Sequence, residues 1–220
     1  MDREKPRIFL FGAGGHAKVI TDAVEKQASA DLICFCDDNN NLWGRNFYNY
    51  PVIGGRSELL SKYEELTLDG GIVALGNNKI RKEVSLWFKS HSISLITVIH
   101  PSAQISRRVK MNAGTVVFAG AVINVDTCIG EGVIINTGAT VDHDCQIGNF
   151  VHISPGANLC GNVSIGDGSF IGAGSTVIPG VTIGKNVIVG AGSTVINDLE
   201  DIMKVAGSPA RSLKVKNAGG

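Results

Sequence analysis

Two histidines stand out in an otherwise apolar, glycine-rich stretch between residues 101 and 196. His143 lies between Asp142 and Asp144 in the run TVDHDC, and His152 follows nine residues later in NFVHIS. A carboxylate beside an imidazole raises its basicity and fixes its tautomer, as a general base near neutral pH requires. The pattern therefore favours acid–base catalysis at His143 over an isolated surface histidine. A metal site is the alternative, but no third histidine or exposed thiol stands close in register, so no metal is predicted.

A glycine-rich turn near the start carries a second chemical signal. The run Gly12-x-Gly14-x-x-Ala17 follows an apolar stretch and precedes a helical pattern, and Asp37 ends the next apolar stretch. This is the spacing of a nucleotide-binding turn, in which the helix N-terminus supplies N–H groups to phosphates. A nucleotide or nucleotide-sugar site is favoured; an NAD site and a purely structural turn remain alternatives. His16 either reaches a phosphate from the first helical turn or is an exposed helix-start histidine.

The element that carries both histidines is a six-residue repeat. Residues 101–196 divide into sixteen hexapeptides without insertion; the third place is always small or Val, and the fifth is Ile, Val, Leu or Met. A helix of 3.6 residues per turn cannot keep this period, whereas short strands joined by tight corners can. Three hexapeptides per coil predict a left-handed parallel β-helix, a triangular prism whose coils repeat every eighteen residues. Gly161 then lies directly above His143, where its N–H is a candidate oxyanion donor.

The first hundred residues alternate short apolar runs with helical patterns. Strands are expected at 7–11, 32–36, 72–75 and 95–99, with helices at 17–28, 57–66 and 79–91. Such alternation predicts a parallel sheet with helical crossovers. The expected fold is thus an α/β Rossmann-like N-terminal domain (1–100), a left-handed β-helix (101–196) and a C-terminal cap or tail (197–220).

The composition excludes several classes of partner. Twenty acidic residues balance twenty basic ones, which argues against binding nucleic acid or an anionic membrane surface. No run approaches the ~20 apolar residues of a membrane-spanning helix, and the start lacks the apolar core of a signal peptide. Five cysteines without a disulfide-like spacing suit a reducing compartment, so a soluble, cytoplasmic protein is expected.

Several motifs together resemble a known family. These are GAGGHAKV, FCDDN, PVIGG, ALGNNKIR, IHPSA, GATVDHDCQIGNFVHISPGA and AGSPAR, which extend over nearly the whole chain. The chain resembles the bacterial hexapeptide-repeat sugar acyltransferases grouped with the sialic acid O-acetyltransferases. Within that group it is most similar to the nucleotide-4-amino-sugar N-acetyltransferases of the UDP-bacillosamine type.

The resemblance implies a homotrimer, with acetyl-coenzyme A (acetyl-CoA) lying between neighbouring prisms and the nucleotide sugar on the N-terminal domain. It implies His143 as the base and Asp144 as its supporting carboxylate, although the family often has Glu at that position. His152 corresponds to a histidine near the acetyl group. Residues matching the family's acetyl-CoA site are Asn136, His152, Gly161, Ala173, Ala191, Gly207, Pro209 and Arg211. Those matching its nucleotide-sugar site are Gly14, Gly15, His16, Asp37, Asp38, Gly76, Asn77 and Arg81.

The expected activity is direct acetyl transfer from acetyl-CoA to the 4-amino group of a nucleotide-linked sugar, with UDP favoured, in cell-surface polysaccharide biosynthesis. O-acetylation of sialic acid or another sugar hydroxyl is the nearest alternative. A non-enzymatic β-helical scaffold and an NAD-dependent oxidoreductase are more distant ones. An acyl-enzyme on Cys145 is disfavoured, because third places point into the prism.

Overall fold

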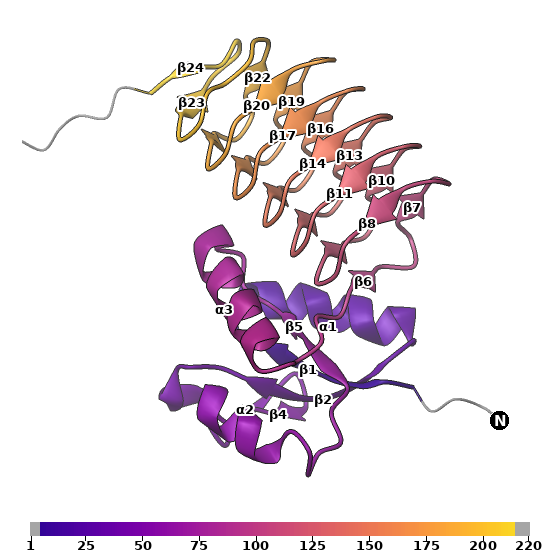
Figure 1. The fold of residues 1–220 in the computed structure, drawn as a ribbon, viewed down its shortest axis with the longest axis vertical. Coiled ribbons are helices and arrows are strands. Elements are labelled where there is room, and N and C mark those ends of the chain that lie inside the picture. The colour runs from indigo at the N-terminus through magenta and orange to yellow at the C-terminus, as the bar shows by residue number, and fades with distance from the viewer. Residues whose placement is uncertain (1–4, 214–220) are drawn as a thin grey trace, which may run out of the picture.

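The computed structural model describes residues 5–213, in which an N-terminal α/β domain packs against one end of a long prism (Figure 1). The N-terminal sheet has three parallel strands in the order β2-β1-β5. Its elements are β1 (Arg7–Phe11), α1 (Gly15–Gln27), β2 (Asp31–Cys36), η1 (Asn40–Leu42), β3 (Asn46–Phe47), β4 (Tyr50–Pro51), α2 (Arg56–Lys62), β5 (Gly70–Val73) and α3 (Asn78–Ser90). No helix among the described residues is long and apolar enough to span a membrane.

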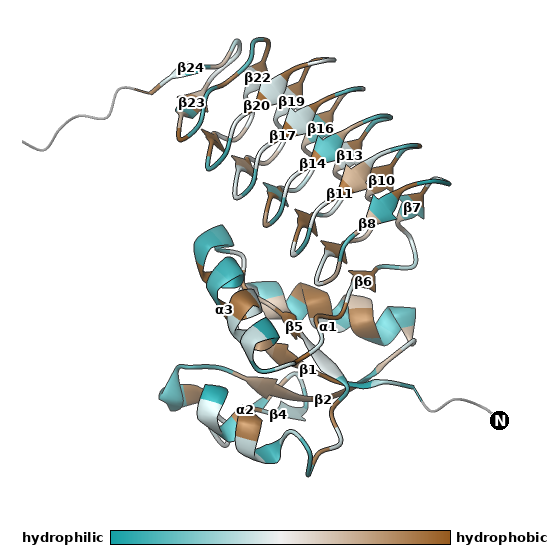
Figure 2. Cartoon of the chain, in the orientation of Figure 1, coloured by the Kyte–Doolittle hydropathy of each residue, from teal (hydrophilic) through white to brown (hydrophobic). Residues whose placement is uncertain are grey.

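The two faces of this sheet bury different helices because strand side chains alternate. Ile8 and Leu10 of β1 face α1, whereas Phe9 and Phe11 face α2 and α3. The α1 side continues without a break into the prism, where Val98 and other apolar side chains of the first coils complete the same core. The hydrophobic colour of β6 where it meets the N-terminal domain is visible in Figure 2. The domain is therefore docked on the prism through a shared apolar core.

The prism consists of three sheets, one for each face, in which all strands pair in parallel except the last pair of the first face, which is antiparallel. The first face contains β6 (Val98–Ile99), β9 (Val116–Val117), β12 (Ile134–Ile135), β15 (His152–Ile153), β18 (Phe170–Ile171), β21 (Ile188–Val189), β23 (Lys204–Ala206) and β24 (Arg211–Ser212). The second contains β7 (Gln104–Ile105), β10 (Val122–Ile123), β13 (Thr140–Val141), β16 (Asn158–Leu159), β19 (Thr176–Val177) and β22 (Thr194–Val195). The third contains β8 (Lys110–Met111), β11 (Cys128–Ile129), β14 (Gln146–Ile147), β17 (Ser164–Ile165) and β20 (Thr182–Ile183).

The eighteen-residue coil predicted from the hexapeptides is confirmed by the strand register. Thr140 pairs with Asn158, and Gln146 with Ser164, each eighteen residues further along the chain. Third and fifth places point inward, so Cys145 and Ile147 are almost fully buried. The left-handed β-helix and the parallel α/β domain are both confirmed.

The fourth N-terminal strand expected at 95–99 is wrong. Only Leu95 bridges to Gly71 of the N-terminal sheet, whereas Val98–Ile99 pairs with Val116–Val117 and opens the first face of the prism. The reason is the register: Val98 lies eighteen residues before Val116, so it continues the prism's own apolar column. After Ile196 the spacing shortens, and β23 pairs with β21 sixteen residues earlier in the chain. Residues 214–220 of the expected C-terminal cap and residues 1–4 lie outside the described residues.

Candidate active site

His143 lies at a corner of the prism, in the turn that joins β13 of the second face to β14 of the third. Its Nδ1 is 2.8 Å from Oδ2 of Asp144, and its backbone N–H donates to Oδ1 of Asp142 at 2.8 Å. Asn124, one coil earlier, donates to the same oxygen of Asp142 at 2.7 Å. The hydrogen bond to Asp144 and the negative charge of Asp142 both raise the pKa of His143. Because the His143 side chain is 55% exposed, its Nε2 can be reached from outside.

Gly161, one coil further along the chain, packs against the His143 ring. A Cβ at this position would lie 2.6 Å from both Cε1 and Nε2 of His143, closer than side chains approach. Although it sits at a corner, Gly161 is buried because the ring covers it. Its N–H makes no hydrogen bond within residues 5–213. The expected stacking of Gly161 on His143 is thus present, and glycine is the residue that permits it.

His152 occupies a very different environment on the first face of the prism. It is only 8% exposed, since the N-terminal domain covers it. Its Nδ1–H donates to the carbonyl of Gly76 at 3.3 Å, and its Nε2 accepts from Nδ2 of Asn136 at 3.2 Å. Burial, together with the positive charge of Arg81, lowers the pKa of His152 to about 4. This imidazole is neutral at physiological pH.

The two histidines lie on opposite sides of one prism. His143 is at the corner between the second and third faces, and His152 is in β15 of the first face. In a triangular prism the corner between two faces lies opposite the third face. Within one chain the structure therefore does not bring His143 and His152 together.

The remaining residues expected at the acetyl-CoA site divide in the same way. Gly161 lies on the His143 corner. Most of the others follow the corner between the first and second faces, where backbone hydrogen bonds link successive coils, as from Gly192 to Ala173. Along this edge lie Asn136, Ala173 and Ala191; Gly207 and Pro209 lie in the turn after β23, and Arg211 begins β24.

Most residues expected at the nucleotide-sugar site gather at the carboxyl ends of β1, β2 and β5. Gly12 must be glycine, since its φ is +110° and a Cβ would meet the carbonyl of Ala74 at 2.9 Å. Gly14 and Gly15 are exposed at the start of α1, and a Cβ added to either would have no atom within 4 Å. Open parallel sheets bind ligands at this edge, where the strand order changes direction. The glycine turn is thus open to a ligand.

The acidic residues after β2 have structural partners. Oδ2 of Asp37 accepts from the N–H of Ala13 at 2.8 Å, which ties the glycine turn to the end of β2. Asp38 is exposed, and its Oδ2 lies 3.1 Å from Nε of Arg56. Asp37 therefore borders the glycine turn and helps to hold its shape, whereas Asp38 faces Arg56 of α2.

His16 lies deeper than an exposed helix-start residue would. Its ring is 6.3 Å from that of His152 and 5.4 Å from that of Phe118, in edge-to-face contact with the latter. Burial, then the nearby His152 and Arg81, lowers the pKa of His16 to about 4. Its Nε2 is enclosed and has no hydrogen-bond partner within the described part of the chain.

Asn77 and Arg81, both expected at the nucleotide-sugar site, make structural contacts within the fold. Oδ1 of Asn77 caps α3 by accepting from the N–H groups of Lys79 and Ile80, at 3.0 and 3.1 Å. Arg81 is 1% exposed and directs its guanidinium to backbone carbonyls and to Asn78. Arg81 thus offers no free donor to a substrate, contrary to the expectation from the family motif, because α3 packs it against the prism.

A groove of about 880 Å³ lies between the N-terminus of α3 and the prism. Gly76 and Asn77 line it on one side, and Phe170 and Ile188 on the other. The ring of Phe170 contacts that of His152 in edge-to-face geometry at 5.1 Å. The groove therefore begins beside His152 and runs along the first face.

Some members of the site were missed from the sequence although the register contains them. Asn124 lies eighteen residues before Asp142, and Phe170 lies eighteen after His152. Looking one coil before and one coil after each of these chemical residues would have identified both. No group of three or more side chains with metal-ligand chemistry occurs among residues 5–213.

Comparison with known proteins gives matches over both parts of the chain. Residues 7–88 match the family "PglD N-terminal domain", and residues 162–197 match "Bacterial transferase hexapeptide (six repeats)". A UDP-N-acetylbacillosamine N-acetyltransferase of Bacillus subtilis (strain 168) is 38% identical over 114 residues, 51% of each chain. The match thus spans about half the length of this curated relative.

Solved structures match over almost the whole length. A variant of perosamine N-acetyltransferase from Caulobacter crescentus, in complex with CoA and GDP-perosamine, is 38% identical with a TM-score of 0.90, covering 94% of this chain and 97% of that one. The acetyltransferase domain of PglB from Neisseria gonorrhoeae FA1090, in complex with acetyl coenzyme A, is 39% identical with a TM-score of 0.89, covering 95% and 100%. With this fold and this coverage, the chain belongs to the family of hexapeptide-repeat nucleotide-amino-sugar N-acetyltransferases.

Proposed function

We propose that this protein transfers the acetyl group of acetyl-CoA to the 4-amino group of a nucleotide-linked amino sugar. The observation that carries the proposal is the His143–Asp144 pair, held at an exposed corner against Gly161. A basic imidazole beside an open N–H is what acyl transfer to an amine needs. The relatives named above, of which one is bound to CoA and GDP-perosamine, support this choice of donor and acceptor.

In the proposed reaction His143 acts directly on the attacking amine. Its Nε2 removes a proton from the amine while the amine nitrogen bonds to the thioester carbonyl carbon. The Gly161 N–H donates to the oxygen that becomes negatively charged. The C–S bond then breaks, and the proton held by His143 passes to the departing thiolate of CoA. Asp144 keeps Nδ1 protonated, so Nε2 stays free to accept the proton.

The opposite placement of the two histidines supports a homotrimer whose sites lie between copies. His143 and Gly161 of one chain would face the edge that carries Asn136 and Ala173 of the next chain, together with its His152. Acetyl-CoA would lie along that edge toward Gly207, Pro209 and Arg211. The glycine turn, with Gly14, Gly15 and His16, would hold the diphosphate of the sugar nucleotide at the N-terminus of α1. Asp37, Asp38, Gly76 and Asn77 would border it.

The five cysteines are free in the structure. Together with a donor produced by central metabolism, this supports a cytoplasmic enzyme of cell-surface polysaccharide biosynthesis. Because the net charge of the chain is zero, its overall charge provides no attraction for nucleic acid.

The test is CoA release from acetyl-CoA, followed with a thiol reagent, across UDP-, GDP- and dTDP-linked 4-amino sugars and CMP-linked and free sialic acid. We expect rapid release with one 4-amino sugar nucleotide, with the UDP form tried first. Release with sialic acid alone would contradict an amine acceptor and favour O-acetylation. If no acceptor leads to CoA release and acetyl-CoA does not bind, the protein would instead be a non-enzymatic scaffold.

The site between copies can be tested by mixing two inactive variants. His143→Ala and His152→Ala chains are co-expressed in one cell in equal amounts. If each site takes His143 from one chain and His152 from the next, every mixed trimer regains one complete site of its three, so about a quarter of all sites in a randomly mixed sample are restored. Recovery of no activity, with mixed oligomers verified by two affinity tags, would contradict this arrangement.

A further inference from the structure

Arg81 is a buried cation that no carboxylate neutralises within residues 5–213. Its side chain lies on α3 and donates from all three of its nitrogens, almost entirely to backbone carbonyls. Burial lowers its pKa to about 9. Burying an uncompensated charge is costly, so its carbonyl partners must be closely placed. Such an arrangement calls for a role beyond packing.

The contacts of Arg81 set the position of α3 on the prism. Nε donates to the carbonyl of Gly132 at 2.7 Å, and Nη2 donates to that of Phe150 at 2.9 Å. Asn78, which accepts from Nη2 at 2.8 Å, donates in turn to the carbonyl of Gly168 at 2.9 Å. Gly132, Phe150 and Gly168 are the same corner position in three successive coils, each with a positive φ. Arg81 and Asn78 therefore contact three coils of one edge.

The same guanidinium also reaches the residue that holds His152. Nη1 of Arg81 donates to the carbonyls of Leu75 and Gly76, at 3.1 and 3.2 Å. The Gly76 carbonyl is also the acceptor for Nδ1–H of His152. On the other side of the ring, Nε2 accepts from Asn136. One chain of hydrogen bonds thus runs from Arg81 through Gly76 and His152 to Asn136.

We propose that Arg81 is a positioning residue for His152: it fixes the Gly76 carbonyl so that the imidazole is held neutral, as the Nδ1–H tautomer with Nε2 accepting. This gives Arg81 a role in the site that does not involve touching either substrate. That the His152–Asn136 end then orients the donor rests on the function proposed above. The assignment of the His152 tautomer to Arg81 does not depend on that function.

None of the groups packed around His152 stabilises its protonated, positively charged form. From α1 it faces His16, and from α3 it faces Arg81; on the prism side Asn136 and Phe170 are uncharged. A positive charge on His152 would therefore be repelled by Arg81 and would find no carboxylate among these neighbours. Burial is the larger cause of the depressed pKa of His152 and Arg81 is the second, so removal of Arg81 should raise this pKa part of the way toward the ordinary ~6.5.

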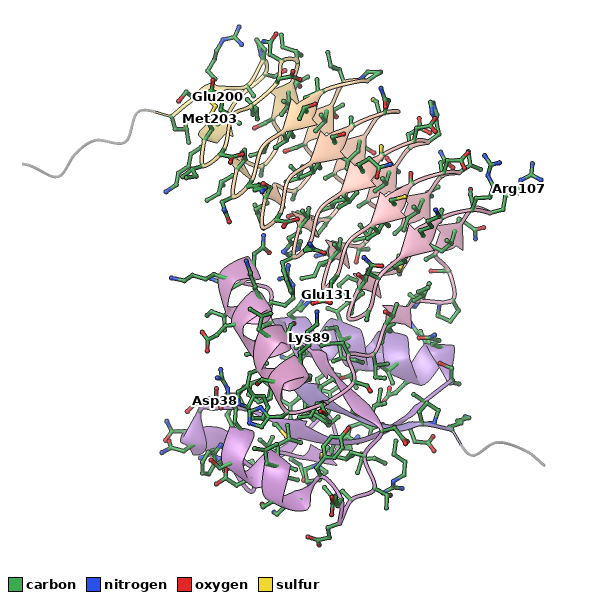
Figure 3. The ribbon with its side chains drawn as sticks, viewed as in Figure 1. Asp38, Lys89, Arg107, Glu131, Glu200 and Met203 are labelled. Atoms are coloured by element: carbon green, nitrogen blue, oxygen red, sulfur yellow. The ribbon has the colours of Figure 1, made fainter. Side chains whose placement is uncertain are left out.

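The experiment measures His152 directly, in the full-length protein. Histidine is labelled with ¹⁵N, the His152 signals are assigned by their loss in His152→Asn, and tautomer and titration are followed by NMR between pH 5 and 8. Arg81→Met removes the charge and the donors, whereas Arg81→Lys keeps the charge. Lys89→Met is the matched control, because Lys89 also lies on α3 and forms an ion pair with Glu131 of the prism (Figure 3).

We expect the wild-type, Arg81→Lys and Lys89→Met proteins to keep His152 neutral as the Nδ1–H tautomer throughout this range. In Arg81→Met the midpoint should rise by at least ~1 pH unit, and the tautomers should mix. In the acetyl-transfer assay kcat/KM of Arg81→Met should then fall toward acidic pH with that new midpoint. If Arg81→Met does not fold, the test uses Arg81→Lys only. A His152 in that variant that titrates with the midpoint of an ordinary histidine would overturn the inference.

A folded Arg81→Met protein whose His152 titrates like wild type would overturn it as well. So would a Lys89→Met protein with the same rise, since loosened docking would then explain both. The NMR result is independent of the activity. An enzyme that acetylates none of the acceptors can still keep the His152 tautomer, so failure of the proposed function is distinguishable from failure of this inference.

Discussion

Replacing Gly161 with alanine tests whether the ring of His143 must lie where the structure places it. The new Cβ would stand 2.6 Å from Cε1 and Nε2 of His143 and 3.2 Å from Nδ1, so the ring must move by about an ångström or more. Gly161 does not have a positive φ, so the backbone accepts alanine without strain. The ring is more than half exposed and can swing outward into solvent.

Gly161→Ala should therefore lower catalysis much more than it lowers stability. The free energy of unfolding should change by no more than ~0.5 kcal/mol, because the ring that covers Gly161 can move into solvent without straining the prism. The value of kcat should fall about 10²-fold, since an ångström of misplacement costs a general base that much. The Gly161 N–H survives in the alanine variant, so the loss reports on the position of His143 and not on a missing oxyanion donor.

The assay is CoA release at saturating donor and acceptor, with urea unfolding as the stability measurement. The control is a double-mutant cycle with His143→Asn, which removes the base but keeps a similar shape. If Gly161→Ala acts by displacing the ring, it costs little further activity in the His143→Asn background. Near wild-type kcat in the single variant, or full additivity in the double variant, would refute the reasoning.

Three further outcomes are expected. In Asp144→Asn the pKa of His143 should fall, because Asp144 is the main cause of its elevation; the acidic limb of kcat/KM then moves to lower pH and the maximum rate drops, whereas an unmoved limb would argue against the pairing. Ile153→Ala, at a fully buried fifth place, should lower the free energy of unfolding in urea by about 2–5 kcal/mol, and Gln146→Ala, on an exposed place, by little. Prolonged treatment with a chelator should leave CoA release unchanged; lost activity restored by a divalent metal would contradict the metal-free mechanism.

The prism was predictable from the sequence because its period leaves few alternatives. Each coil packs only on its neighbours, so the local six-residue pattern determines the inward positions, including those of Cys145 and Ile147. The start of the prism was not found in this way. The sequence pattern of Val98 and Ile99 predicts one more strand of the α/β domain. Only their pairing with β9, one coil later, assigns them to the prism.

The substrate side was harder to predict, because a motif does not distinguish a ligand contact from a structural one. Arg81 and Asn77 lie in the run ALGNNKIR, which matches the family, yet one is buried under α3 and the other caps that helix. Besides the nearby carbonyls of Leu75 and Gly76, the carbonyls of Gly132 and Phe150 hold Arg81, and these come from prism corners more than fifty residues further along the chain. A pattern within one segment cannot show partners at that separation.

The spacing of the two histidines carries more information than their types. Nine residues is half of an eighteen-residue coil, so a prism with three faces must place His143 and His152 on opposite sides whatever their side chains do. Two groups so placed within one chain cannot act on the same atoms, but two copies can bring a corner of one against a face of the next. In the reaction proposed above, the exposed imidazole beside Asp144 would move a proton, and the buried neutral one beside Gly76 would orient a neutral group without competing for that proton. The same period that fixes the fold thus argues for an active site that one chain cannot complete alone.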